Sequence, residues 1–167
     1  MTSVTRQAPR FHVPDLGPRG EGWVALQAIL FVAVIATGFA GPAWAGTTRA
    51  LGALAGLALI AGGVALIAGG ILGLRRQLTA FPRPVDDGQL IEDGAFGLVR
   101  HPMYGGGVLF AFGWGILMAS VPTLVCAVAL ALLFDLKSRR EEAWLDQRFP
   151  TYADYRRRTP RLLPWVY

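Results

Sequence analysis

Cysteine and histidine are almost absent from this chain of 167 residues. It contains one cysteine, Cys126, which lies inside an apolar stretch, and two histidines. A disulfide framework needs paired cysteines and a zinc site needs several Cys or His ligands, so we expect neither, and no metal site. The chain also lacks a glycine-rich turn between a strand and a helix. Any nucleotide-like cofactor must therefore bind without a Rossmann domain.

Charged residues are scarce as well. They make up 16% of the chain against 53% hydrophobic residues, and the mean hydropathy is positive. This composition is too apolar for an ordinary soluble domain. Residues 22–48, 50–74 and 101–134 contain no Asp, Glu, Lys or Arg, and a helix needs only ~20 apolar residues to cross a bilayer. The sequence predicts an integral membrane protein.

The third apolar stretch is interrupted near its middle by Ser120 and Pro122, which indicates two short helices joined by a tight turn. We therefore expect an all-α membrane helical bundle of about four transmembrane helices, with a C-terminal helical hairpin and a cytoplasmic tail. Residues 1–21 are predicted to form a cytoplasmic N-terminal arm, and residues 22–167 a single transmembrane domain. The expected helices are 22–40, 49–74, one from Pro102, one from Pro122 to about Arg148, and a short amphipathic helix over 152–158.

The basic residues predict the orientation in the membrane. Of the sixteen Lys and Arg residues, all except Arg49 fall on one side of the predicted spans, together with every acidic residue. The positive-inside rule then places both termini in the cytoplasm, and we expect a bacterial inner-membrane protein. Such a basic rim is attracted to anionic membrane lipid. Nucleic-acid binding is not expected, because the basic residues are not interleaved with stacking aromatics on a soluble module.

Small residues recur at helical spacing on two predicted helices, where they allow another helix to approach closely. We expect them to serve packing within the bundle, and a homo-oligomer formed through the same faces stays open. The two stripes are Ala61, Ala65, Gly69 and Gly73 on the second helix and Ala111, Gly115 and Ala119 on the third.

One cluster of polar residues at the membrane boundary indicates a functional site. The segment Arg100-His101-Pro102-Met103-Tyr104-Gly105 precedes a charge-free helix, and the pair Glu141-Glu142 follows the next one. Ionisable groups at the mouths of membrane helices are costly, so they favour a site of chemistry. Residues 105–107 are all glycine, which favours close approach of the backbone to a ligand.

The chain resembles the isoprenylcysteine carboxyl methyltransferase family and its bacterial phospholipid-methyltransferase-like relatives. The resemblance covers residues 90–164 and rests on the segment ending in Arg100-His101-Pro102-Met103-Tyr104-Gly105, the helical hairpin, Glu141-Glu142-Ala143-Trp144-Leu145, Phe149, Tyr152, Tyr155 and Arg161-Leu162-Leu163-Pro164. It implies S-adenosylmethionine as the cofactor, bound on the cytoplasmic side between the hairpin and the C-terminal tail. The implied cofactor-binding residues are Arg100, His101, Pro102, Tyr104, Gly105, Glu141 and Glu142.

The implied reaction is methyl transfer to an oxygen or nitrogen nucleophile. A carboxylate acceptor needs positioning more than a base, whereas an amine acceptor loses a proton, for which Glu142 is the candidate base. In the prenyl-protein enzymes an arginine about one turn before the Glu pair is implicated near the substrate. Here Lys137 occupies that position with Arg139 and Arg140 close by, and we assign Glu142, Arg139 and Arg140 as the catalytic residues.

We expect the methyl acceptor to be lipophilic or amphiphilic and to enter sideways from the bilayer, because no soluble substrate domain is present. An isoprenylcysteine-type carboxylate and a phospholipid or isoprenoid amine or hydroxyl all remain open. Two alternatives concern the function itself. One is a nicotinamide-dependent membrane reductase, which shares the Arg-His-Pro-x-Tyr element, and the other is a non-enzymatic membrane scaffold. The adjacent Glu141 and Glu142 favour methyl transfer.

Overall fold

The chain is all-α over the residues that the computed structural model describes, 13–40, 46–79 and 88–166. The described elements are α1 (Glu21–Gly38), α2 (Gly46–Leu74), a 3-10 turn (Arg75–Gln77), α3 (Ala95–Leu98), α4 (Pro102–Leu117), α5 (Val121–Arg148) and α6 (Tyr152–Arg158). The predicted helix boundaries agree with these to within a few residues. Most of the predicted N-terminal arm lies outside the described residues.

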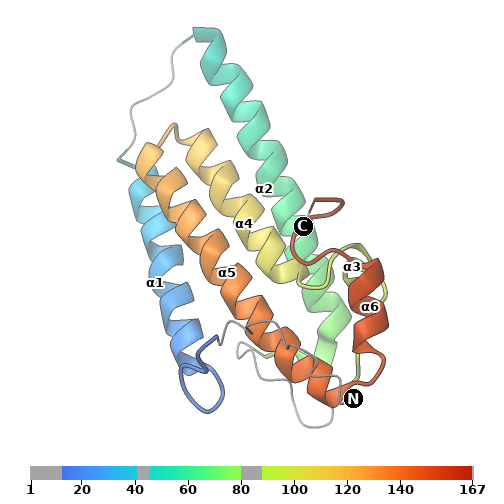
Figure 1. The fold of residues 1–167 in the computed structure, drawn as a ribbon. Coiled ribbons are helices and arrows are strands. Elements are labelled where there is room, and N and C mark those ends of the chain that lie inside the picture. The colour runs from blue at the N-terminus through green and yellow to red at the C-terminus, as the bar shows by residue number, and fades with distance from the viewer. Residues whose placement is uncertain (1–12, 41–45, 80–87, 167) are drawn as a thin grey trace, which may run out of the picture.

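The long helices lie side by side in the order α1, α5, α4, α2 (Figure 1). Helix α4 packs against α2 on one side and α5 on the other, while α1 packs mainly on α5. Helices α1, α2 and α5 are long and apolar enough to cross a membrane, and α4 is a shorter apolar helix. The prediction of a membrane helical bundle with a hairpin, α4–α5, at its C-terminal side is confirmed.

Helices α2 and α4 meet through glycines spaced seven residues apart on each helix. A Cβ atom added to Gly63 would lie 2.5 Å from the carbonyl oxygen of Gly106, and one on Gly56 would lie 2.7 Å from that of Gly113. The same distances hold in reverse, because each glycine of α4 faces the carbonyl of its counterpart on α2. The two backbones are therefore in direct contact, which small residues permit in membrane helices.

This contact corrects the predicted packing face of α2. Ala61 and Ala65 are exposed, whereas Gly69 faces Ala95 of α3 and Gly73 faces the Phe96 ring. The stripe spaced by four residues thus does not form the main helix contact, and a homo-oligomer through it stays a prediction.

Two of the three residues of the second predicted stripe pack inside the bundle. Ala111 is fully buried in a core cluster that includes Ala127 and Leu130 of α5, and a Cβ on Gly115 would lie 2.7 Å from the Leu124 side chain. Ala119 lies beyond the end of α4 and is only partly buried.

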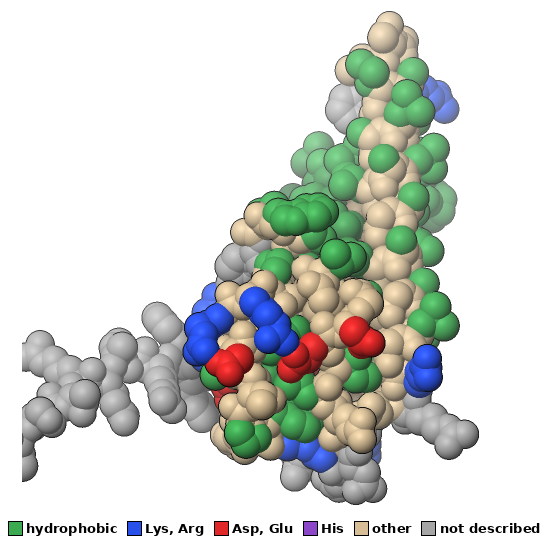
Figure 2. Space-filling view, turned by 90° about the vertical axis from the view of Figure 1, so that its right-hand side faces the viewer, with side chains coloured by type: hydrophobic (Ala, Val, Ile, Leu, Met, Phe, Trp, Pro, Cys, Tyr) green, Lys and Arg blue, Asp and Glu red, His purple; other side chains and the backbone are tan. Residues whose placement is uncertain are grey.

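Helix α5 is longer than a membrane span requires. Its 28 residues correspond to about 42 Å at 1.5 Å per residue, which exceeds the ~30 Å hydrocarbon layer. Charged side chains gather at the end of the molecule where α5 and α6 lie. Away from that end, α2 presents mainly apolar and small groups (Figure 2). The chain then turns at Phe149, forms α6, and returns to the start of α4.

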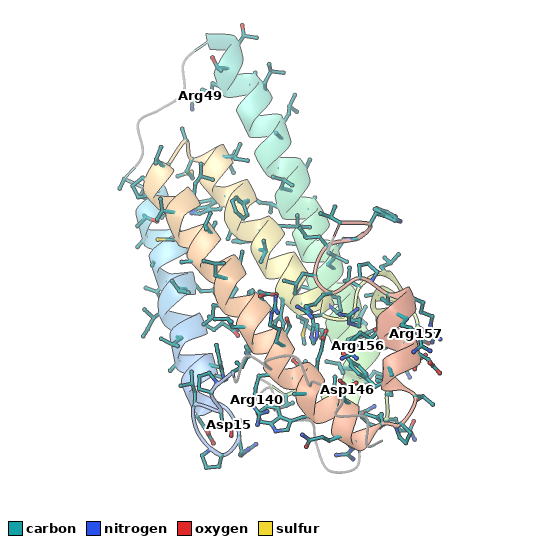
Figure 3. All side chains as sticks on the ribbon, in the orientation of Figure 1. Asp15, Arg49, Arg140, Asp146, Arg156 and Arg157 are labelled. Atoms are coloured by element: carbon teal, nitrogen blue, oxygen red, sulfur yellow. The ribbon has the colours of Figure 1, made fainter. Side chains whose placement is uncertain are left out.

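The orientation is testable because Arg49 and Arg157 lie at opposite ends of the molecule (Figure 3). In a Cys126→Ala background, we expect Thr47→Cys to react with a membrane-impermeant maleimide on intact cells. Arg157→Cys should react only after permeabilisation, because the positive-inside rule places α6 in the cytoplasm. The reverse pattern would contradict the orientation.

The glycine contact between α2 and α4 predicts different effects for two adjacent substitutions. Gly63→Ala places a methyl group against the α4 backbone and should lower the free energy of unfolding by about 1–3 kcal/mol. Gly62→Ala has no atom within 4 Å of its Cβ, so it should be neutral or stabilise by up to ~1 kcal/mol through helix propensity. Denaturant unfolding of both variants in detergent measures the difference, and equal effects would rule out the close contact.

Candidate active site

The C-terminal segment lies flat on the start of α4. The backbone N–H of Arg100 donates to the carbonyl of Pro160 at 2.9 Å, and the N–H of His101 donates to that of Arg161 at 3.0 Å. A Cβ on Gly105 would collide with the carbonyl oxygen of Leu162. The tail is therefore held against the motif by main-chain hydrogen bonds, and this approach requires glycine at position 105.

The three consecutive glycines pack against protein, which corrects the expectation that they admit a ligand. Gly105 faces the tail, Gly106 faces the α2 backbone, and Gly107 faces the rings of Phe31 and Phe134. The first turn of α4 is thus enclosed on three sides. Gly105, predicted to bind the cofactor, is a packing residue between the helix and the tail.

Glu142 forms the centre of a buried ion cluster. Its Oε1 accepts from Nε of Arg100 at 2.9 Å and from Nε of Arg161 at 3.2 Å, and lies 3.2 Å from Nε2 of His101. Its Oε2 accepts from Nη2 of Arg161 at 3.2 Å. The residue is 4% exposed. A carboxylate with these cationic partners is fully engaged, because burying it without them would be prohibitive.

The two arginines extend this cluster into the tail. Nη1 of Arg100 donates to the carbonyl of Arg156 at 3.0 Å and to that of Thr159. Nη1 of Arg161 donates to Asp135 at 3.0 Å. Glu142 thus joins α5 to α4, α6 and the C-terminal segment. It is not among the residues that line the cavity described below, and its cofactor binding and its role as a base stay predictions.

Glu141 has a different environment from its neighbour. Its Oε2 accepts a hydrogen bond from the Tyr104 hydroxyl at 3.0 Å and lies 3.6 Å from Nδ1 of His101. The His101 ring therefore stands between the two carboxylates. It also stacks on Tyr104, with centroids 5.4 Å apart, and Tyr104 stacks on Phe134 at 4.8 Å. This column of rings fixes the position of the Glu141 carboxylate.

A cavity of about 470 Å³ adjoins this column. Its volume falls within the ~300–1,000 Å³ of small-molecule sites. Its walls are mostly apolar and come from every described helix, with Glu141 and Lys137 as the charged groups on α5. The lining residues are Gln27, Phe31, Ile67, Ile71, Leu74, Gln77, Leu78, Thr79, Gly88, Gln89, Leu90, Ile91, Phe96, Arg100, His101, Pro102, Met103, Tyr104, Phe134, Lys137, Glu141, Leu145, Phe149, Tyr152 and Tyr155.

Lys137 is a cavity residue that we did not assign to the site from the sequence. It is 1% exposed, its Nζ donates to Oε1 of Gln27 at 2.6 Å, and it lies 4.9 Å from the centroid of the Tyr104 ring. The sequence carried a signal for it, because residues four apart share a helix face and Lys137 is four residues before Glu141.

Arg139 and Arg140 do not line the cavity, and their assignment as catalytic residues stays a prediction. Arg139 is exposed and its Nε donates to Asp135 at 2.8 Å. Arg140 pairs with Asp15 and lies 4.2 Å over the Trp144 ring, and Figure 3 shows this pair near the base of α1.

Five of the residues predicted to bind the cofactor line the cavity: Arg100, His101, Pro102, Tyr104 and Glu141. The other two do not line it, because Gly105 contacts the tail and Glu142 pairs with Arg100.

Two tyrosines of α6 complete the wall. Tyr152 and Tyr155 meet edge to face, with centroids 5.8 Å apart, and the Tyr155 hydroxyl donates to the carbonyl of Phe96 at 2.6 Å. Burial raises the pKa of both hydroxyls above the ordinary value. Both groups are therefore neutral hydrogen-bond donors at physiological pH.

A sequence model of one family, described as phospholipid methyltransferase, matches residues 51–152. The match runs from α2 through the motif at the start of α4 to the Glu pair and Tyr152. The chain belongs to the phospholipid methyltransferase family. This membership confirms the resemblance on which the predicted site was based.

Individual relatives match somewhat less than half of the chain. The cobalt-zinc-cadmium resistance protein CzcN of Cupriavidus metallidurans is 38% identical over 45% of this chain and 35% of its own length. Protein-S-isoprenylcysteine O-methyltransferase of Schizosaccharomyces pombe is 34% identical over 48% of this chain and 35% of its own. The mouse Delta(14)-sterol reductase TM7SF2 is 32% identical over 47% and 20%. The chain thus spans about a third or less of the length of these relatives.

The ion cluster predicts that Glu142 is mainly a stabilising residue. Glu142→Ala leaves the buried Arg100 and the partly buried Arg161 without their carboxylate, and should lower the free energy of unfolding by about 3–5 kcal/mol. Arg139→Ala removes an exposed ion pair on the same helix and should cost less than about 1 kcal/mol. Unfolding in detergent compares the two, and a stable Glu142→Ala variant would refute the structural role.

Proposed function

We propose that this protein transfers a methyl group from S-adenosylmethionine to a lipophilic or amphiphilic acceptor in the membrane. The observation that carries the proposal is the Glu141 carboxylate, which faces a largely apolar cavity built from the sequence motif of a methyltransferase family. A single carboxylate with stacked aromatic rings around it attracts a cationic ligand. S-adenosylmethionine carries a sulfonium and an ammonium group.

The charged groups of α5 complement the amino-acid part of this cofactor. Lys137 and Glu141 lie one turn apart on the same face and both line the cavity. The Glu141 carboxylate suits the ammonium group, and the Lys137 ammonium suits the carboxylate. Tyr104 and His101 hold Glu141 in place through the contacts described above. The cofactor would supply the methyl group, and these side chains would orient it for in-line attack.

The acceptor would reach the cavity from the bilayer. The membrane-facing walls are Phe31 of α1 and Ile67 and Ile71 of α2. Among the described residues, α1 and α2 do not pack on each other, so the cavity is bounded here by two separated helices. An apolar tail would occupy this space while its polar end meets the methyl group. An ionised carboxylate acceptor needs no base, whereas an amine acceptor would have to lose a proton.

A nicotinamide-dependent reduction is the second candidate, because the chain is also 32% identical to a sterol reductase over 47% of its length. The family match favours methyl transfer. We further propose a location in the bacterial inner membrane with the cavity on the cytoplasmic side, because the basic residues lie at that end.

The test combines cofactor binding with transfer of label. Purified protein in lipid nanodiscs is titrated calorimetrically with S-adenosylmethionine and with reduced nicotinamide cofactor. It is then incubated with methyl-labelled S-adenosylmethionine and either total membrane lipid extract or water-soluble metabolites. We expect binding of S-adenosylmethionine only, and label in the lipid phase. Binding of the nicotinamide cofactor instead, or label only in the water-soluble pool, would reject the proposal.

Two matched variants test whether the cofactor binds in the cavity. Glu141→Gln keeps the shape of the side chain and removes its charge. Loss of a charge-assisted hydrogen bond of ~1.5–3 kcal/mol should weaken binding of S-adenosylmethionine about tenfold or more. Glu92→Gln makes the same change outside the cavity, at a residue paired with Arg158, and should leave the affinity unchanged. Equal affinities would remove Glu141 from the site.

A further inference from the structure

Tyr152 presents a polar atom that the fold does not use. The residue is 1% exposed and lines the cavity, yet its hydroxyl oxygen is buried without a hydrogen-bond partner among the described residues. Its neighbour Tyr155, packed edge to face against it, donates to the Phe96 carbonyl. The hydroxyl groups of these two tyrosines therefore differ. The Tyr155 hydroxyl has a hydrogen-bond partner in the fold, and the Tyr152 hydroxyl has none among the described residues.

An unpaired buried hydroxyl reduces stability, because the group has lost its water and gained nothing in return. Packing alone does not explain a tyrosine here, since phenylalanine would provide the same ring for the contact with Tyr155. Buried polar groups without a partner in the protein call for another explanation, such as a bound ligand. The cavity beside Tyr152 is the place where such a ligand would lie.

The surroundings of Tyr152 indicate which part of the cavity it serves. Tyr152 lines the cavity together with the charged residues Arg100 and Glu141, which form the polar end of its lining. Apolar residues such as Phe31 and Ile67 line other parts of it. Burial keeps the hydroxyl protonated, so it offers a hydrogen to an acceptor atom. An acceptor at the polar end belongs to the cofactor rather than to the lipid tail.

We propose that Tyr152 is a cofactor-binding residue, whose hydroxyl donates a hydrogen bond to an oxygen atom of S-adenosylmethionine held in the cavity. The inference rests on the proposed function and extends it to a residue of α6. The carboxylate and the ribose of the cofactor both provide oxygen acceptors. The hydroxyl that is unsatisfied in the free protein would be satisfied in the complex, so its contribution would appear only on binding.

The experiment compares Tyr152→Phe with Tyr155→Phe in nanodiscs. For Tyr152→Phe we expect an unchanged or higher thermal midpoint without ligand, because an unpaired polar atom is removed. Its dissociation constant for S-adenosylmethionine should rise about fivefold, the equivalent of one net hydrogen bond. For Tyr155→Phe we expect a lower midpoint, because the Phe96 carbonyl loses its donor, and a dissociation constant within about twofold of the unaltered protein.

The outcomes separate this inference from the function on which it rests. If the unaltered protein binds S-adenosylmethionine and Tyr152→Phe binds it equally well, the role of Tyr152 is refuted and the function stands. A lower ligand-free midpoint for Tyr152→Phe would also refute it, because the hydroxyl would then be structural. If the unaltered protein does not bind the cofactor, the proposed function fails first. In turnover, the KM for the cofactor should rise and the KM for the lipid acceptor should not.

Discussion

The buried carboxylate of Glu142 is the interaction on which the rest of the site depends. Two arginines and a histidine, from the start of α4 and from the tail, converge on it. Each of these groups would be costly to bury alone, and together they neutralise one another. The cluster thereby ties three separate parts of the chain to α5 at the place where α5 leaves the membrane. Together with the hydrogen bond from Tyr155 to the Phe96 carbonyl, it holds α6 as a wall of the cavity.

Helix geometry places the two adjacent glutamates in different environments. Because consecutive residues are rotated by 100°, Glu142 can point into the ion cluster while Glu141 points toward the cavity. The face that carries Glu141 also carries Phe134, Lys137 and Leu145, which are spaced by three or four residues. His101 contacts both carboxylates and so couples the two environments. A stable ion cluster thus fixes the position of the carboxylate that we propose to bind the cofactor.

The helix boundaries could be predicted from the sequence because they depend on local chemistry. The contacts between helices and between distant side chains could not, because they depend on partners elsewhere in the chain. Helix boundaries followed from apolar length and from residues such as Pro102 and Ser120, which begin or cap a helix in any context. The packing face of α2 could not be predicted in this way, because its small residues form one stripe spaced by four residues and another spaced by seven. Only the glycines of α4 show that the stripe spaced by seven makes the contact. The positions of the Arg139 and Arg140 side chains depend on partners in a similar way. Their partners, Asp135 and Asp15, turn them away from the cavity, and Asp15 is remote in sequence.

The glycines at the start of α4 show how folding and ligand binding share one motif. Residues that sequence reasoning assigned to ligand approach instead let the tail, α2 and the aromatic side chains close around the helix. Such contacts leave no room for a ligand at the glycines themselves. They do bring walls from distant segments within reach of one another, so that the space remaining between α1, α2, α5 and α6 becomes a cavity. Close packing on one side of α4 is therefore the condition for an open site on the other.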